Sequence, residues 1–177
     1  LGDVYKRQVH GQPNMYFLFM AMAVKMLRTN GEFVFITPRS WTSGTYFKSF
    51  RSYFMDSMDI QRVHLFESRN SVFKGKEGHS DDILQETMIT YGKKSKSQSR
   101  NIIIAISQNA QDLGKVKEIQ VESGNCLPEG KEHYFVLPSD EEDLKVLNYM
   151  KKMPNTVEEA GFRFKTGQVV EFRNKEY

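Results

Sequence analysis

The feature that most constrains this sequence is an apolar helix pattern that passes, after one Asn-Gly pair, into a short apolar strand pattern. Residues 14–28 are apolar on nearly every helical face, which is typical of a buried helix. Asn14 is a good N-cap, and Gly31 is suited to a left-handed cap at the other end. Residues 32–37 (EFVFIT), which Pro38 ends, predict a strand buried on both faces. This order predicts one αβ half of a parallel α/β sheet.

The next elements continue the α/β pattern. The loop 38–44 (PRSWTSG) follows the carboxyl end of the predicted strand, which is the edge where ligands bind in open α/β sheets. Residues 45–58 predict an amphipathic helix with one aromatic stripe. Residues 60–66 and 83–91 have the composition of strands. Because the long polar stretch 67–82 separates them, we expect these two strands to pair antiparallel and close the sheet.

The chain changes character after a Lys/Ser-rich stretch at residues 93–100, which we interpret as a linker. Beyond it, residues 101–107 and 116–121 predict two strands. Ser139 is the expected cap of a helix that runs to about Lys152, with acidic residues in its first turn. The second part of the chain is therefore expected to be a mixed α+β segment.

Composition excludes several classes of protein. The single cysteine, Cys126, allows no intrachain disulfide framework and no four-cysteine zinc site, so we expect a reducing, cytoplasmic setting and no metal. The longest apolar run, residues 15–24, is far shorter than the roughly 20 residues that cross a bilayer, so no membrane span is expected. The net charge of +3 permits a polyanionic partner without requiring one. The sequence contains no Walker loop, G-x-S-x-G or G-x-G-x-x-G motif.

The two ends of the chain suggest a piece of a longer protein. The first residue is not Met, and the last, Tyr177, comes straight after a predicted strand. Residues 1–8 (LGDVYKRQ) resemble a translated scar at the end of an assembled fragment and are left out of the fold prediction. The alternative is that they form an ordinary short strand or turn.

Between residues 9 and about 91, several short motifs occur in a fixed order. They are N-x-Y-x-x-F (Asn14, Tyr16, Phe19), L-R-x-x-G (Leu27, Arg28, Gly31), FVFITPRSWTSG, F-R-x-x-F (Phe50, Arg51, Phe54), the pair Val72-Phe73, and ILQETMI. In this order they resemble the adenine-specific, amino-methylating DNA methyltransferases of restriction–modification systems. The closest likeness is to the branch in which the methylase and the target-recognition region share one chain. The helix–strand–Thr-Pro piece alone also occurs widely in class I methyltransferases.

The resemblance implies a Rossmann-like class I methyltransferase domain that uses S-adenosylmethionine and acts on double-stranded DNA. Residues 9–94 would be the C-terminal part of that domain, and residues 95–177 a linker and the start of the target-recognition region. A restriction endonuclease would be fused to the same chain or act as a separate partner. The family's Asn-Pro-Pro-Tyr motif and its Gly-containing cofactor loop are absent and expected upstream. No catalytic residue is therefore expected here, and this piece alone should be inactive.

The resemblance also implies roles for individual aromatic residues. Phe19 matches an aromatic that packs against the cofactor's adenine, and Asn14 and Tyr16 belong to the same motif. The alternative is that Phe19 is plain helix core. Phe73 matches an aromatic that stacks on the flipped-out adenine, which must leave the duplex before its amino group can react. The alternative is that Phe73 only anchors its loop to the sheet.

Basic side chains supply candidate contacts to DNA phosphates. The candidates are Arg39, Lys48, Arg51, Arg69, Lys74 and Lys76, of which Arg39, Arg69, Lys74 and Lys76 lie in loops at the expected DNA-facing edge. Each of them could instead be an ordinary solvated charge. Residues 161–172 (GFRFKTGQVVEF) resemble the start of the family's target-recognition region, so the side chains that read the base sequence would lie further on.

Two other functions remain open at this point. One is a class I methyltransferase that acts on RNA or protein, which would share the cofactor-binding half. The other is a non-enzymatic DNA-binding α/β module without a cofactor. This second alternative predicts that Asn14, Phe19 and Phe73 do not converge around one cleft.

Overall fold

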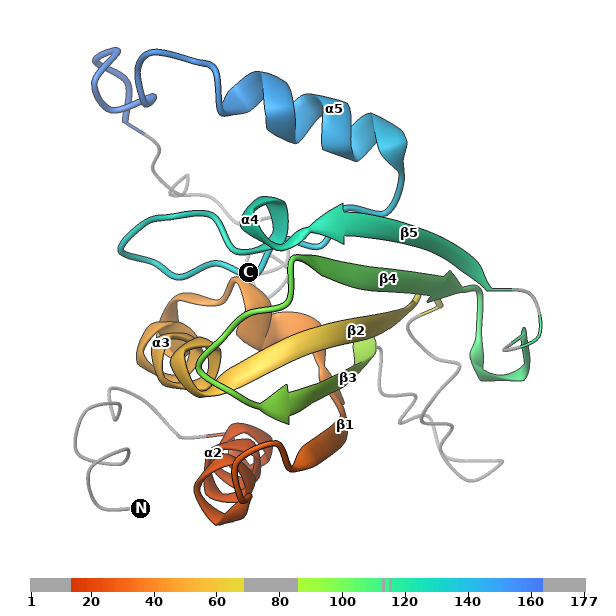
Figure 1. Ribbon diagram of the computed structural model, residues 1–177. Helices are drawn as coiled ribbons and strands as arrows, with labels where there is room; N and C mark the ends of the chain where they lie inside the picture. Colours follow the sequence, from red (N-terminus) through yellow and green to blue (C-terminus); the bar gives the residue numbers. More distant parts are fainter. Residues whose placement is uncertain (1–13, 69–85, 113, 115, 164–177) are drawn as a thin grey trace, which may run out of the picture.

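The computed structural model describes residues 14–68, 86–112, 114 and 116–163. These residues form a mixed α/β structure around a five-stranded sheet (Figure 1). The elements in chain order are α2 (Met15–Met26), β1 (Glu32–Pro38), η1 (Arg39–Thr42), η2 (Thr45–Phe47), α3 (Lys48–Ser57), β2 (Met58–Phe66), β3 (Thr87–Lys94), β4 (Asn101–Ser107), η3 (Ala110–Asp112), β5 (Lys117–Glu122), α4 (Ser123–Cys126) and α5 (Glu141–Met150).

The strand order in the sheet is β1-β3-β2-β4-β5. β3 pairs antiparallel with both β1 and β2, so β1 and β2 run in the same direction with β3 inserted between them. β4 then pairs parallel with β2, and β5 pairs antiparallel with β4. The expected antiparallel partner of residues 60–66 is thereby confirmed.

The sheet extends beyond the limits that the sequence indicated. Lys93 and Lys94 belong to β3, where they pair with Asp59 and Met58, so their assignment to a linker was wrong. The reason is that ladder hydrogen bonds hold these two lysines whatever their side chains are. The pairing of β4 with β2 also carries the sheet past residue 94. The functional division of the chain at that residue stays a prediction.

A β-bulge marks the middle of the pairing between β2 and β3. The register shifts between Ile60 and Arg62, and Gly92 of β3 lies opposite Ile60. A Cβ atom at Gly92 would overlap the carbonyl oxygen of Asp59 and come within 2.9 Å of the Phe33 ring. Glycine is therefore required here because two backbones approach closely at the bulge.

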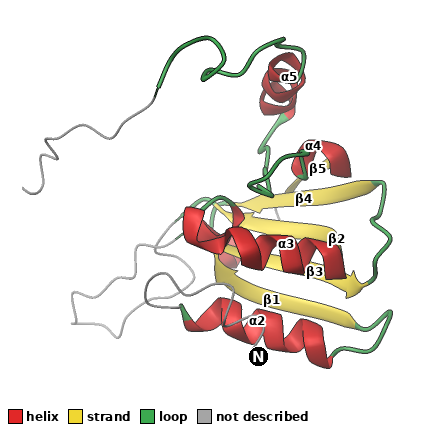
Figure 2. Ribbon diagram, turned by 90° about the vertical axis from the view of Figure 1, so that its left-hand side faces the viewer, coloured by secondary structure: helices red, strands yellow, loops and turns green. Residues whose placement is uncertain are grey.

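Helices α2 and α3 pack against each other and against the sheet (Figure 2). In α2 the buried residues are Phe17, Met20, Ala21 and Val24. The ring centroid of Phe17 lies 5.6 Å from that of Phe50 in α3. Figure 1 shows α5 lying apart from these layers, beyond α4 and β5, and α5 contains no buried residue.

Two predictions of complete burial were wrong for the described residues. Met15, Phe19 and Met26 of α2 are exposed, and so are Val34 and Ile36 of β1. The physical reason is that no described element covers these side chains, although the backbones of Val34 and Ile36 pair with β3. An apolar pattern shows that the side chains favour removal from water. They are buried only where another element covers them.

The structure also corrects two helix caps. Asn30 adopts the left-handed conformation (φ 62°) that was expected of Gly31. Asn tolerates this region because its short polar side chain can bond locally. At the start of α5 the N-cap is Asp140, whose carboxylate accepts from the amide of Asp143. Ser139 instead donates to the Asp143 carboxylate, through both its amide and its hydroxyl.

No helix in the described part of the chain is long and apolar enough to cross a membrane.

Candidate functional site

The loop 39–44 leaves the carboxyl end of β1 and is anchored by Trp41. Its first four residues form the short helix η1. The Trp41 indole is fully buried, and its Nε1 donates to Oγ1 of Thr37 at 3.2 Å. Its ring packs edge-on against Phe54, with 5.5 Å between centroids. The one tryptophan of the sequence therefore fixes the loop to α3 and to the end of β1.

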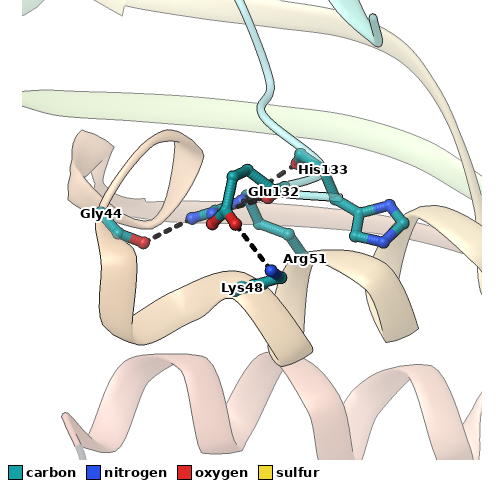
Figure 3. A network of polar contacts seen from close by, with 5 residues as sticks. All are labelled: Gly44, Lys48, Arg51, Glu132 and His133. Atoms are coloured by element: carbon teal, nitrogen blue, oxygen red, sulfur yellow. Dashed lines mark hydrogen bonds and ion pairs between the residues drawn. The ribbon is translucent and has the colours of Figure 1, made fainter. Parts of the chain in front are cut away.

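A buried arginine joins this loop to a segment much later in the chain (Figure 3). Arg51 of α3 is fully buried. Its Nη1 donates to the carbonyl oxygens of Trp41 (3.0 Å) and Gly44 (2.6 Å). Its Nε and Nη2 donate to the carbonyl oxygen of Glu132, and Nε also reaches that of His133. Five hydrogen bonds to backbone oxygens compensate for the burial of the charge.

Residues 132–137, which we call the return segment, lie beside the loop 39–44. The amide of Phe135 donates to the Thr42 carbonyl at 2.9 Å, and that of Val136 to the Cys126 carbonyl at 2.7 Å. The Phe135 ring is buried, with its centroid 5.8 Å from that of Trp41. The return segment is therefore held by backbone bonds, by one aromatic contact and by Arg51.

A cavity of about 560 Å³ opens between the loop 39–44 and the return segment. It lies at the carboxyl end of β1 and the amino end of β3, because the amide of Arg39 donates to the Glu86 carbonyl there at 2.8 Å. Its lining combines one guanidinium, one carboxylate, several hydroxyls and aromatic and aliphatic groups. The lining residues are Arg39, Ser40, Thr42, Ser43, Glu86, Tyr134, Phe135, Val136 and Leu137.

The structure brings one predicted phosphate contact and one predicted cofactor residue to this region. Arg39 lines the cavity, half-buried. The Tyr16 hydroxyl lies 3.1 Å from Oγ of Ser40. Burial raises the pKa of Tyr16, and its hydrogen bond with Ser40 lowers that pKa only in part. Asn14 and Phe19 are not among the lining residues: Asn14 is exposed at the start of α2, and the Phe19 ring is 52% exposed.

Two of the predicted phosphate contacts have other roles. Arg51 is fully buried, and its guanidinium is saturated with carbonyl oxygens, so that prediction was wrong. Burial lowers the pKa of Arg51, although the neighbouring Tyr134 and Glu132 counteract this. Lys48 forms an ion pair of 2.6 Å with Glu132 and thereby holds the pKa of that carboxyl below its usual value. A basic residue on an amphipathic helix predicts solvent exposure, and nothing local reveals a distant partner.

The other predicted site residues lie outside the described part of the chain. They are Phe73, Arg69, Lys74 and Lys76. The convergence of Asn14, Phe19 and Phe73 around one cleft therefore stays a prediction.

Sequence reasoning placed Ser43 in the loop at the ligand-binding edge but missed Glu86 and Tyr134 as lining residues. A signal for the last was present: residues 134–138 (YFVLP) form an apolar run inside a polar stretch, which indicates a segment that docks on a core. Among the described residues, no group of three or more His, Cys, Asp or Glu could hold a metal ion.

Comparison with known proteins gives the family. Residues 1–73 match the family model described as Eco57I restriction-modification methylase. The type II methyltransferase M.PstI of Providencia stuartii is 31% identical over 164 residues, which is 92% of this chain. The type II methyltransferase M.BsuBI of Bacillus subtilis is 32% identical over 167 residues, again 92% of the chain. The chain belongs to the restriction–modification DNA methyltransferase family.

The chain spans about a third of the length of those relatives, 31% in each case. Among solved structures, the M protein of the type I restriction enzyme EcoKI matches 85% of the chain and 46% of its own length. The TM-score is 0.51 and the identity 8%, so this likeness concerns the fold alone.

Proposed function

We propose that this chain is part of a site-specific DNA methyltransferase of a restriction–modification system. The enzyme transfers a methyl group from S-adenosylmethionine to the exocyclic amine of adenine in double-stranded DNA, after flipping the base out of the helix. The observation that carries the proposal is the alignment with two type II methyltransferases along 92% of the chain. That alignment covers most of the sheet and of the loops at its edge.

The sheet topology supports a Rossmann-like class I methyltransferase fold within this proposal. β1 and β2 run parallel, with β3 inserted antiparallel between them, and α2 and α3 pack alongside. In open α/β sheets the carboxyl ends of parallel strands form the ligand-binding edge. The cavity beside Arg39 lies at that end of β1.

Phe19 of α2 fits a cofactor contact, because its exposed ring offers an aromatic face to an adenine ring. Asn14 is also exposed and lies at the N-cap of the same helix. Tyr16 contributes through packing instead, since its hydroxyl bonds to Ser40 and its ring centroid lies 5.9 Å from that of Phe47. When bound, S-adenosylmethionine would supply a methyl group that leaves its sulfonium sulfur as the amine nitrogen attacks.

The described residues have a positioning role in this proposal. An amine whose protons are hydrogen-bonded to acceptors keeps its nitrogen lone pair available for attack. Placing this nitrogen close to the methyl donor lowers the activation barrier further. The groups that bind the amine would belong to an Asn-Pro-Pro-Tyr motif upstream of Leu1, and Phe73 would stack on the flipped base. Arg39, with Arg69, Lys74 and Lys76, would contact DNA phosphates. The 177-residue chain alone is then inactive.

The test begins with the coding DNA upstream of Leu1. An in-frame Asn-Pro-Pro-Tyr motif, preceded by a Gly-rich strand–turn–helix pattern, is expected. The complete protein is then incubated with radiolabelled S-adenosylmethionine and duplex DNA, and the nucleosides are separated by mass spectrometry. N6-methyladenine is the expected product. Label in RNA or protein, or a continuous frame that lacks the tetrapeptide, would overturn the proposal.

The role of Phe19 is tested in the same complete protein. The variant Phe19→Ala is expected to raise KM for S-adenosylmethionine with little change in KM for DNA. Met26→Ala is the matched control, because Met26 is also exposed and apolar but lies at the far end of α2. Equal effects of the two substitutions would mean that Phe19 makes no cofactor contact.

A further inference from the structure

The loop 39–44 is fixed from outside through its backbone oxygens. Nη1 of Arg51 donates to two of them, the carbonyl oxygens of Trp41 and Gly44. The return segment donates to a third, the carbonyl oxygen of Thr42, at 2.9 Å. The conformation of this loop therefore depends on α3 and on the return segment as well as on its own sequence.

Arg51 is itself oriented by the return segment. Its Nε and Nη2 donate to the carbonyl oxygen of Glu132, and Nε also donates to that of His133 at 3.0 Å. Figure 3 shows the guanidinium between Gly44 on one side and these two residues on the other. Because the donors of a guanidinium form a rigid planar fork, the place of the return segment decides where Nη1 points. A displacement of the return segment would therefore also displace the loop.

An unusual backbone conformation presents these oxygens to Arg51. His133 has a φ of 51°, in the left-handed region that few residues other than glycine adopt. Histidine and asparagine are found there more often than most residues, whereas a β-branched residue is a rare outlier. The His133 side chain is exposed, and Arg51 bonds to the backbone oxygen of this residue. The backbone conformation at position 133 is therefore the feature that the network needs.

The loop held in this way lies at the edge where the proposed reaction takes place. It follows the carboxyl end of β1, and such ends form the ligand-binding edge of an open α/β sheet. It also carries Arg39, the proposed phosphate contact, two residues before Trp41. Displacing a substrate-positioning group by about 1 Å can lower the rate of an enzyme roughly a hundredfold. The position of this loop should therefore matter for DNA.

We propose that Arg51 is a positioning residue of the methyl-transfer reaction, through which the return segment places the loop 39–44, and with it Arg39, against DNA. Arg51 itself touches no substrate in this arrangement, because its guanidinium is buried and saturated with carbonyl oxygens. The proposed cofactor contact lies on α2, whose Phe17 packs on Phe50 of α3. The loss of Arg51 should therefore affect DNA more than the cofactor. This inference rests on the proposed function, since it assumes that the substrate is DNA.

The first test measures KM for DNA and for S-adenosylmethionine in the complete protein with Arg51→Lys. Lysine keeps the charge but cannot bridge the loop and the return segment. KM for DNA is expected to rise at least about tenfold, and KM for S-adenosylmethionine less than about twofold.

Gly92→Ala is the control for this test, because it strains the bulge between β2 and β3 without touching the loop 39–44. KM for DNA should stay near its original value in this variant. An equal rise in KM for DNA in both variants, or an equal rise for both substrates in Arg51→Lys, would mean a general loss of structure and would overturn the proposal. An unchanged KM for DNA in Arg51→Lys would also overturn it.

The second test changes the return segment and leaves Arg51 in place, so it does not require Arg51→Lys to fold. His133→Val puts a β-branched residue in the left-handed region, so the two oxygens should turn away from the guanidinium. KM for DNA is expected to rise about fivefold. His133→Asn is the conservative variant, because asparagine tolerates this region, and it should restore most of the lost affinity. Equal KM values for DNA in the two variants would overturn the role of the return segment.

The two proposals fail in different ways. If the complete enzyme methylates adenine in DNA while KM for DNA is unchanged in Arg51→Lys and in His133→Val, only the positioning role is removed. If the label from S-adenosylmethionine appears in RNA or protein instead, the proposed function fails, and the substrate named for this inference fails with it.

Discussion

Two nitrogens of the Arg51 guanidinium donate to the carbonyl oxygen of Glu132, Nε at 3.2 Å and Nη2 at 2.8 Å, although the two residues are 81 positions apart in the sequence. The same side chain holds the loop 39–44 through Trp41 and Gly44. One fully buried residue of α3 thus sets the distance between the two walls of the cavity.

Replacing Arg51 by lysine keeps the charge but removes the planar fork. A lysine ammonium cannot reach the four carbonyl oxygens at once, so several would stay buried without a donor. We expect the free energy of unfolding to fall by about 2–4 kcal/mol. Urea unfolding of the 177-residue chain, followed by the fluorescence of the buried Trp41, measures this loss.

Lys48→Met is the control for Arg51→Lys. It removes the ion pair with Glu132 but leaves the buried network intact. Because both partners are well exposed, its effect should be much smaller and should shrink further in added salt. Equal stability of Arg51→Lys and the unmodified chain would contradict the role given to the fork.

Gly92→Ala should destabilise the sheet at its bulge. The new Cβ meets the Asp59 backbone, which cannot move aside without breaking the ladder, and the Phe33 ring. We expect a loss of about 1–3 kcal/mol. Gly124→Ala is the matched substitution, because a Cβ there has nothing within 4 Å. A pair of variants with the same unfolding midpoint would show that β2 and β3 do not approach as described.

The stability of the chain should fall as the pH drops below neutrality because of His64. Burial lowers the pKa of His64, and Arg62 adds to this, although Glu118 opposes it. Its Nε2 lies 2.8 Å from Oγ of Ser107. The unfolded chain, with a histidine pKa of about 6.5, then binds a proton that the folded chain rejects. The free energy of unfolding therefore decreases as the pH falls through about 6.5 toward the pKa of His64 in the folded chain.

Urea unfolding between neutral pH and about pH 5 checks this expectation. Burial alone would raise the pKa of Asp59, but hydrogen bonds from Ser99 and Gln61 hold this pKa below its usual value, so the loss that this carboxylate causes belongs to more acidic conditions. His64→Asn should flatten the dependence in the window below neutrality. If the free energy of unfolding of this variant still decreases with pH in that window, the effect belongs to another group.

Cys126 should be unreactive while the chain is folded. Burial raises the pKa of its thiol to about 12, despite the nearby Lys151, so almost no thiolate exists at neutral pH. A thiol reagent at about pH 8 should label the chain in urea within the mixing time but label the folded chain only as fast as it opens. Rapid stoichiometric labelling of the folded chain would contradict the burial of this side chain.

Much of the fold follows from local patterns in the sequence. The strands 101–107 and 58–66 and the helix that begins at Met15 each carry their own periodicity, and each lies close to where it was expected. Exposure was harder to predict, because Phe19 and Val34 are apolar but face outward in the described chain. Whether an apolar side chain is buried or exposed depends on the elements that pack beside it.

The site was only partly predictable. Arg39 follows a strand whose carboxyl end could be located, so its place at this edge of the sheet was predictable, whereas its contact with DNA stays a prediction. Tyr134 and Glu86 could not be assigned, since only the long-range bonds from Arg51 and Arg39 bring their segments to the cavity. The order and spacing of the motifs indicated the family. Both can be seen in the sequence without knowing which residues are in contact.

The insertion of β3 between β1 and β2 has a consequence for how the sheet forms on the ribosome. The last residue of β1, Pro38, pairs with Thr87 of β3, and β2 pairs only with β3 and β4, which are synthesised after it. At about 5–20 residues per second, β1 is complete several seconds before β3 can reach it. Within the described sheet, two apolar strands therefore emerge with unpaired edges during synthesis. They are natural binding sites for chaperones, and the rate of translation between residues 38 and 87 should influence the yield of folded chain.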